Sequence, residues 1–352
     1  MNDRARPILV TGGAGFIGAN FVHHMVDAGN RVVTLDALTY AGNRASLAAL
    51  EAGSNHVFVE GSICDRALVD RLLAAHRPRA IVNFAAESHV DRSIDRPGEF
   101  VETNVVGTYT LLEAARRYVD TVGGAFRFLH VSTDEVYGSI DEGRFTEASP
   151  YAPNSPYAAS KAAADHLVRA YHRTYGLAAI VTNCSNNYGP YQFPEKLIPL
   201  IILNAVDGRS LPVYGDGRQV RDWIFVTDHC RAVAAVLEDG RPGETYLVGA
   251  EEVHENIEIV RKICAVLDRL HPASSGRPYA SLIEHVADRP GHDRRYAIDS
   301  SKLRREFGWR PDVSVEDGIE RTICWYLDNR DWWLPLRGRY DGRRLGLGGE
   351  PT

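Results

Sequence analysis

The sequence lacks the features that would tie the chain to a membrane, a metal or a nucleic acid. Its five cysteines, at positions 64, 184, 230, 264 and 324, are far apart and form no CxxC pair or His/Cys cluster, so we expect no disulfide and no metal site. The chain has no apolar run of about 18 residues, and the apolar segment 8–10 is too short for a signal-peptide core. The net charge is −6 without a basic block, which argues against nucleic-acid or membrane partners. We therefore expect a cytoplasmic protein.

The first half of the chain alternates between two patterns. Apolar runs that predict strands occur between amphipathic runs that predict helices, which is typical of βαβ units and a parallel sheet. We predict an α/β fold, a Rossmann-type doubly wound parallel sheet with a smaller mixed α/β C-terminal substrate lobe. The predicted strands are residues 8–11, 31–36, 56–59, 80–85, 126–131 and 178–182, and the predicted helices are residues 16–28, 66–75, 98–118 and 156–175.

A glycine-rich motif, TGGAGFIG at residues 11–18, lies between the first predicted strand and the first predicted helix. Glycines at this place allow a tight turn and let the backbone approach a pyrophosphate, which then rests on the helix N-terminus. An acid, Asp36, ends the second predicted strand. It can accept hydrogen bonds from the adenosine ribose and repel a 2′-phosphate, so the pattern favours NAD over NADP, although Arg44 is nearby.

The 352 residues are enough for two lobes. After residue 185, loop-forming and aromatic residues become frequent, and helical periodicity returns at 228–238, 254–270, 300–307 and 315–328. We predict the following organisation: an NAD-binding Rossmann domain over residues 1–185 with returning segments from about 218–250, a mainly substrate-binding lobe over residues 186–336, and a flexible tail over residues 337–352.

Two adjacent acids follow directly after a predicted buried strand. The run 126–131 is apolar, and it is followed by Ser132, Thr133, Asp134 and Glu135. In open α/β sheets, ligands bind beyond the carboxyl ends of the strands. If the chain turns there, both carboxyl groups can face one ligand, and their pKa values can be pushed apart so that one donates a proton while the other accepts one.

A Tyr-xxx-Lys pair begins the helix predicted at residues 156–175. Ser155 suits the N-cap and Pro156 the first helical position, so Tyr157 and Lys161 lie on one helix face. A nearby ammonium group favours the phenolate and lowers the pKa of a tyrosine. We therefore expect Tyr157 to accept a proton in alcohol oxidation and Lys161 to assist it and to bind the nicotinamide ribose.

Together these motifs resemble the extended short-chain dehydrogenases/reductases, and further stretches resemble the dTDP-glucose 4,6-dehydratases within that group. The resemblance covers roughly residues 7–330. It is carried by DALTYAGN (36–43), AAESHVDRS (85–93), STDEVYG (132–138), SNNYGPYQFPEKL (185–197), RDW (221–223) and RPGHDRRY (289–296). The acid pair is its most specific element, because related sugar epimerases lack that pair.

The resemblance implies a reaction that begins and ends with NAD. Tyr157 would take the proton of the C4 hydroxyl, and Thr133 would hydrogen-bond the C4 oxygen. Glu135 would remove the C5 proton, and Asp134 would protonate the departing C6 hydroxyl. β-Elimination from a ketone needs one base and one acid, whereas a plain alcohol dehydrogenase needs neither. The resemblance also implies a homodimer that uses the two helices at 98–118 and 156–175.

The resemblance also implies contact residues for both ligands. One departure is Ser62, which stands where the family usually has an aspartate facing the adenine, so we expect an altered adenine contact. Cations at Lys196 and Arg221 suit a diphosphate. The expected NAD contacts are Gly12, Gly15, Phe16, Ile17, Gly18, Asp36, Thr39, Ser62, Ile63, Ala85, Ala86, Tyr157, Lys161 and Asn187, and the expected substrate contacts are Ser88, Thr103, Thr133, Asn186, Lys196, Leu197, Pro212, Tyr214, Arg221, Asn256 and His292.

Two other classes of function remain as alternatives. One is a UDP-hexose 4-epimerase or another nucleotide-sugar dehydratase, and the other is a non-catalytic NAD-sensing protein. The sequence does not decide between a thymidine and a uridine base, because base contacts lie in variable loops.

Overall fold

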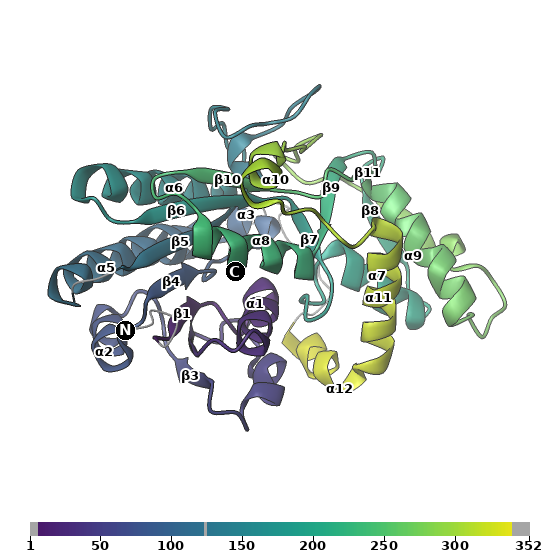
Figure 1. Ribbon diagram of the computed structural model, residues 1–352. Helices are drawn as coiled ribbons and strands as arrows, with labels where there is room; N and C mark the ends of the chain where they lie inside the picture. Colours follow the sequence, from purple (N-terminus) through teal and green to yellow (C-terminus); the bar gives the residue numbers. More distant parts are fainter. Residues whose placement is uncertain (1–5, 123–124, 340–352) are drawn as a thin grey trace.

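A seven-stranded parallel sheet forms the centre of the computed structural model, which describes residues 6–122 and 125–339 (Figure 1). Its strand order is β10-β6-β5-β4-β1-β2-β3, and every neighbouring pair is parallel. Most of these strands are apolar and buried along their length, as a sheet covered on both faces requires. The strands are β1 (Ile8–Thr11), β2 (Val32–Asp36), β3 (His56–Glu60), β4 (Ala80–Asn83), β5 (Arg127–Thr133), β6 (Ala179–Cys184) and β10 (Thr245–Val248).

Helices cover both faces of this sheet and bury a separate core on each. One core lies under α1 (Phe16–Asp27), the 3-10 helix η2 (Arg44–Leu50), α8 (Val226–Asp239) and α10 (Ser301–Phe307). The other lies under α2 (Arg66–His76), α5 (Thr108–Val122) and α6 (Pro156–Tyr175). This arrangement confirms the predicted doubly wound Rossmann-type sheet.

At the start of α6 the predicted cap is also confirmed, because the Ser155 hydroxyl accepts a hydrogen bond from Ala158 N at 3.1 Å and Pro156 is the first helical residue.

The helix predicted at residues 98–118 contains a π-helical segment. The three consecutive parts are α4 (Pro97–Phe100), the π-helix η3 (Val101–Gly107) and α5, and α3 (Val90–Asp95) precedes them. The π segment carries the buried Asn104, which forms reciprocal hydrogen bonds of 2.9 Å with the backbone of Glu87 and donates to Ser160 Oγ at 2.8 Å. π-Bulges are frequent at functional sites, and this one joins the segment after β4 to helix α6.

A second group of elements packs around its own core beside the main sheet. Its small sheets have the orders β11-β9-β7 and β12-β8. The chain crosses between the two cores more than once, because β9 belongs to a small sheet whereas α8 and β10 return to the main one. The elements are β7 (Asn186–Tyr188), α7 (Leu197–Val206), β8 (Leu211–Tyr214), β9 (Val220–Phe225), β11 (Val253–Glu255), α9 (Asn256–Leu270), η5 (Tyr279–Leu282), β12 (Ile283–Val286), α11 (Val315–Asp328), α12 (Arg330–Trp333) and η6 (Pro335–Arg339).

The start of the predicted tail is folded. Residues 337–339 belong to η6, and Arg339 donates a hydrogen bond of 2.9 Å to Gly42 O. The rest of the predicted tail lies outside the described residues. Within the described part of the chain, no helix is long and apolar enough to span a bilayer, and no His, Cys, Asp or Glu side chains gather in a group of three that could hold a metal ion.

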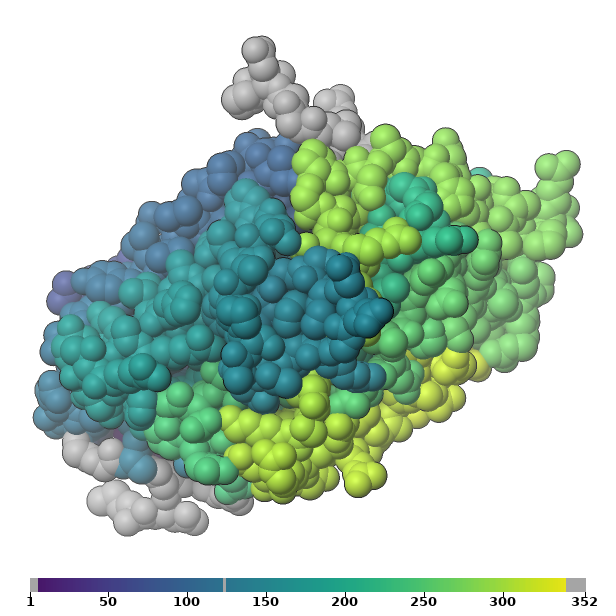
Figure 2. All heavy atoms as spheres, turned by 90° about the horizontal axis from the view of Figure 1, so that it is seen from above, coloured from purple at the N-terminus to yellow at the C-terminus, as the bar shows by residue number. Residues whose placement is uncertain are grey.

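The segment between the 3-10 helix η4 (Asp134–Tyr137) and α6 lies on the surface beside C-terminal residues. Figure 2 shows it in blue-teal at the centre of the face seen from above, next to yellow-green segments. Phe145 anchors it: its N–H donates to Ala297 O at 2.9 Å, and its ring stacks on Tyr137 with centroids 5.2 Å apart. This segment therefore holds Tyr137, the last residue of the turn whose first two residues are the adjacent acids.

Candidate active site

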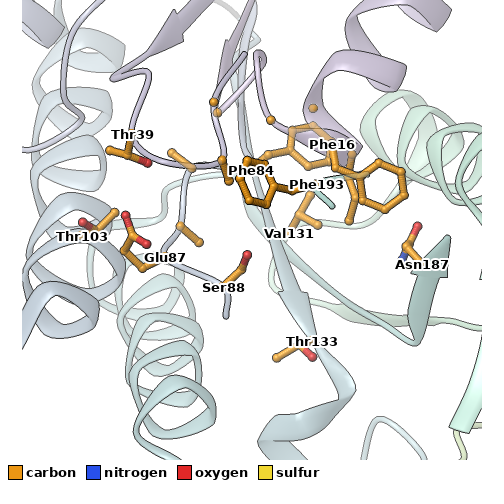
Figure 3. Close-up of a pocket in the computed structure, with 18 of the residues that line it drawn as sticks. Phe16, Thr39, Phe84, Glu87, Ser88, Thr103, Val131, Thr133, Asn187 and Phe193 are labelled. Carbon is orange, nitrogen blue, oxygen red and sulfur yellow. The ribbon is translucent and has the colours of Figure 1, made fainter. Parts of the chain in front are cut away.

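The carboxyl ends of the central strands open into one pocket of 340 Å³ (Figure 3). Its lining comes from the glycine-rich turn after β1, the ends of β2, β4 and β5, the first turns of α6 and the segment after β6. In Figure 3, Glu87, Ser88 and Thr103 gather on one side, and Asn187 lies on the other. All expected cofactor and catalytic residues share this pocket: Gly12, Gly15, Phe16, Ile17, Gly18, Asp36, Thr39, Ser62, Ile63, Ala85, Ala86, Thr133, Asp134, Glu135, Tyr157, Lys161 and Asn187.

The glycine-rich turn is shaped to admit a ligand against the backbone. Gly12 has a φ of 70°, and a Cβ there would lie 2.6 Å from Ala85 N. A Cβ on Gly18 would lie 2.1 Å from Gly12 O, so the helix can approach the turn only without a side chain. Gly15 is the N-cap of α1 and lines the pocket. This cradle fits the pyrophosphate of a dinucleotide.

Asp36 lies where an adenosine ribose would be read. Its two carboxylate oxygens accept hydrogen bonds of 2.8 Å from Ala14 N and Leu38 N, which holds the group at the end of β2. Each carboxylate oxygen keeps a further lone pair for a ribose hydroxyl. Burial raises the pKa of Asp36, and its backbone hydrogen bonds oppose that rise. Arg44, the nearby cation that could have favoured NADP over NAD, is paired with Glu51 at 2.9 Å.

Ser62 is in the pocket wall, at the place expected for the adenine. Its hydroxyl accepts a hydrogen bond of 3.1 Å from Cys64 N, so the side chain is held by its own turn. Ile63 beside it is buried and supplies an apolar surface for a base. Ser62 remains able to donate one hydrogen bond toward the pocket.

The two adjacent acids lie just beyond the end of β5, where the chain turns into η4. Thr133 caps this turn by accepting a hydrogen bond of 3.3 Å from Glu135 N, and its hydroxyl lies 3.4 Å from Asp134 Oδ1. Asp134 is buried and Glu135 is partly exposed, and both line the pocket. The turn therefore brings both acids to one cavity, as the sequence predicted.

The environment separates the pKa values of the two acids. Burial, the Glu135 charge and the Asp222 charge raise the pKa of Asp134 well above its usual value. Burial also raises the pKa of Glu135, but the cations Arg289, Arg221 and Lys196 oppose that rise. Asp134 is consequently the group suited to stay protonated, and Glu135 is the group suited to ionise.

Tyr157 and Lys161 lie on the pocket face of α6, but their electrostatics differ from the expectation. Burial and the Glu135 charge raise the pKa of Tyr157 well above its usual value. The Lys161 ammonium donates to Val131 O at 2.8 Å, and burial lowers its pKa to about 8. The predicted lowering of the tyrosine pKa is therefore outweighed here by removal of the phenol from water.

Three cations that act on the pKa of Glu135 come from the second lobe, which is the group of elements around the second core and the loops between them. Arg221 is buried on β9, donates to Asp293 O at 2.8 Å, and lies 4.2 Å from the centre of the Tyr296 ring. Arg289 pairs with Asp91 at 2.7 Å. Lys196 lines the pocket and donates to Ser88 O at 3.1 Å. This concentration of positive charge next to the acid pair suits a diphosphate.

The expected substrate residues divide into two sets. Ser88, Thr103, Thr133, Asn186 and Lys196 line the pocket. The other expected residues lie on the second lobe outside that lining. Among them, the Tyr214 hydroxyl donates to Asp91 Oδ2 at 2.9 Å, and His292 lies 2.6 Å from Asp288. The set outside the lining is Leu197, Pro212, Tyr214, Arg221, Asn256 and His292.

Sequence reasoning missed several pocket residues. Glu87 and Glu195 are buried carboxyl groups, and Arg92 binds Glu195 at 3.1 Å while it lies 3.8 Å above the Tyr40 ring. Glu87, Glu195 and Tyr40 line the pocket, and Arg92 is outside that lining. Glu87 lies between the expected contacts Ala86 and Ser88, and Glu195 precedes the expected contact Lys196. Their positions next to expected contacts in the sequence could have indicated them.

Comparisons with known proteins agree with this geometry. The family model described as GDP-mannose 4,6 dehydratase matches residues 9–322. A dTDP-glucose 4,6-dehydratase from Xanthomonas campestris is 63% identical over 344 residues, covering 96% of this chain and 98% of the relative. The solved dTDP-glucose 4,6-dehydratase of Streptomyces venezuelae, with NAD bound, has a TM-score of 0.87 and 52% identity, covering 94% of this chain and 99% of that one.

The sugar epimerases are less similar. The UDP-glucose 4-epimerase of Thermus thermophilus, solved with NAD, has a TM-score of 0.82 and 31% identity, covering 92% of this chain and 99% of that one. The fold is thus shared with these epimerases, whereas the sequence is more similar to the dehydratases. The chain belongs to the family described as GDP-mannose 4,6 dehydratase and, within it, to the dTDP-glucose 4,6-dehydratases.

Proposed function

We propose that this chain is an NAD-dependent lyase that converts dTDP-glucose to dTDP-4-keto-6-deoxy-glucose. One observation carries the proposal: the acid pair Asp134 and Glu135 lies in the same pocket as a dinucleotide cradle and the Tyr157–Lys161 pair. A dehydrogenase or an epimerase needs the cradle and the tyrosine. Only a reaction that removes water across a carbon–carbon bond also needs an acid and a base there.

The protein groups divide the proton transfers between them. NAD held beside Tyr157 and Lys161 would supply an acceptor for the C4 hydride and a donor of that hydride to C6. Tyr157 accepts the C4 hydroxyl proton while Thr133 holds the oxygen by a hydrogen bond. The ketone acidifies the C5 hydrogen, which Glu135 removes as a proton. Asp134 protonates the C6 hydroxyl, which leaves as water, and C5 regains a proton when the hydride adds to C6.

The electrostatics of the acid pair support this assignment of roles. Burial and the neighbouring Glu135 and Asp222 charges raise the pKa of Asp134, which favours the protonated form that an acid catalyst needs. Glu135 faces three cations that favour its ionised form, which a base needs. Because the two environments push the two pKa values apart, the roles follow from position and not from residue type.

The cations of the second lobe support a nucleoside diphosphate as the carrier of the sugar. Arg221 and Lys196 would bind the two phosphates, since a diphosphate is recognised by cations near its oxygens. Both also act on the pKa of Glu135, so binding of the diphosphate and ionisation of the base are coupled through the same charges. A homodimer and a cytoplasmic location, expected from the sequence, belong to the same proposal.

Incubation with dTDP-glucose and NAD tests the proposal. Nuclear magnetic resonance of the product should show a new methyl doublet and a 4-keto group. A galactose product would instead support the epimerase alternative, and NAD binding without turnover would support the sensor. UDP-glucose as a parallel substrate tests the base, because the proposal expects faster turnover of the thymidine nucleotide.

A further inference from the structure

A buried row of polar groups lies behind the catalytic pair, on the side away from the pocket. Asp165 is four residues after Lys161 on α6, so the two share a helix face. Asp165 is fully buried, as is His130 on β5 between them. The mechanism above uses neither residue, yet buried ionisable groups are costly to keep unless they are paired.

Hydrogen bonds from the first strand fix the proton position on His130. Thr11 Oγ1 donates to Asn83 Oδ1 at 2.6 Å, so the Asn83 amide nitrogen must be the donor at its other end. That nitrogen lies 3.0 Å from His130 Nδ1. His130 Nδ1 is therefore an acceptor, and a neutral imidazole then carries its proton on Nε2. Burial and the Lys161 charge lower the pKa of His130 well below its usual value, which agrees with the neutral form.

The proton on His130 Nε2 points between two charged groups. His130 Nε2 lies 3.5 Å from Asp165 Oδ1 and 3.4 Å from Lys161 Nζ. An N–H donor is attracted to a carboxylate and is not an acceptor for an ammonium group. Asp165 and Lys161 therefore lie within 3.5 Å of the same ring nitrogen, and the attraction acts directly between the carboxylate and the ammonium group.

Burial raises the pKa of Asp165, and the Lys161 charge and the donors around Oδ2 oppose that rise and favour the carboxylate. Its Oδ2 accepts from Asn183 Nδ2 at 3.0 Å and from the Tyr151 hydroxyl at 2.8 Å. The Tyr151 oxygen in turn accepts from Arg169 at 2.7 Å, so its proton is directed to Asp165. A protonated Asp165 would need an acceptor, and these contacts supply donors instead.

We propose that Asp165 is a positioning residue whose carboxylate, beside the same edge of His130, holds Lys161 in its charged form and thereby governs proton transfer at Tyr157. The part that concerns Tyr157 rests on the proposed function. The charge of Asp165 raises the pKa of Lys161 against the effect of burial, and Cys184 is the other ionisable group that acts on it. If the carboxylate is removed, Lys161 should lose its proton at lower pH, and the Tyr157 phenolate should lose a cation four residues away on the same helix face.

The chain suits a direct measurement, because its only four lysines are at positions 161, 196, 262 and 302. Carbon-13 labelling of the lysine ε-carbon gives four resonances, which single Lys→Arg variants assign. We expect Lys161 in the wild-type protein to titrate with a pKa of about 8. In Asp165→Asn its midpoint should fall by roughly one pH unit or more. Tyr151→Phe, which keeps the carboxylate but removes a donor to it, should produce a smaller fall.

The control is Asp228→Asn, a buried aspartate on α8 whose Oδ2 accepts from Asp312 N and Val313 N at 3.0 Å. It should leave the Lys161 midpoint in place. A folded Asp165→Asn protein with an unchanged Lys161 midpoint would overturn the proposal, as would an equal shift in the control. With substrate, the pH of half-maximal C4 oxidation should rise in Asp165→Asn. The titration needs no turnover, so it stands even if the wild-type protein forms no dehydrated product.

Discussion

Glu135→Gln isolates the elimination step, because it removes a base while it preserves shape. The side chain reaches the pocket from η4, and Thr133 and Tyr157, to which the proposal assigns the chemistry at C4, are not changed. C4 oxidation should therefore proceed and then stop. Burial and the Asp222 charge still raise the pKa of Asp134 after the substitution, so we expect Asp134 to be a poor replacement for the base.

The size of the effect follows from the loss of one proton acceptor. General base catalysis contributes about 10²–10⁴-fold, which corresponds to roughly 3–5 kcal/mol of transition-state stabilisation. Product formation should fall by that factor while oxidation at C4 keeps its rate. In a stopped-flow experiment, the near-ultraviolet absorbance of reduced nicotinamide should rise toward one equivalent per active site and persist.

A matched control is Glu87→Gln, which changes a buried carboxyl group on the Thr103 side of the same pocket (Figure 3). It should not accumulate reduced nicotinamide, because the base remains. Product formation by Glu135→Gln at the wild-type rate would refute the assignment. So would equal accumulation of reduced cofactor in both variants.

Two further predictions concern the cradle and the cations. Gly12→Ala places a Cβ 2.6 Å from Ala85 N at a φ of 70°, so the free energy of unfolding should fall by roughly 3 kcal/mol and NAD binding should be lost. The control Gly29→Ala, at a φ of 81° with open space around it, should lower the free energy of unfolding by only about 1 kcal/mol and keep NAD binding. Urea denaturation and NAD titration check both variants, and equal losses would contradict the account. Arg289→Gln removes a cation that lowers the pKa of Glu135, so that pKa rises and the acidic limb of the pH–rate profile should move roughly 0.5–1 unit to higher pH; a shift to lower pH would refute the sign.

Local sequence patterns were sufficient for six of the seven strands of the main sheet and for the centre of the site, whereas β10 was expected only within a segment that returns to the sheet. The apolar run before Thr133 and the turn chemistry of the glycine motif depend on near neighbours in the sequence, so their positions could be read directly. The same holds for the spacing of Tyr157 and Lys161, which one helix turn places on one face.

Other features depend on contacts between distant segments, and no local pattern reports them. Arg289 faces Glu135 only because the second lobe packs over the carboxyl ends of the strands, and it also pairs with Asp91 almost two hundred residues away. The raised pKa of Tyr157 depends on how completely the pocket excludes water, which spacing does not reveal. The π segment arises where Asn104 bonds to the Glu87 backbone, a contact that helical periodicity could not indicate.

The account's central claim is that the hydrogen removed from C4 is returned to C6 of the same sugar. The most direct measurement uses dTDP-glucose that carries deuterium at C4, with product analysis by nuclear magnetic resonance and mass spectrometry. The account predicts deuterium in the new methyl group and, in deuterated water, solvent hydrogen at C5. Loss of the C4 deuterium to solvent, or its return to C4 in a galactose product, would contradict it.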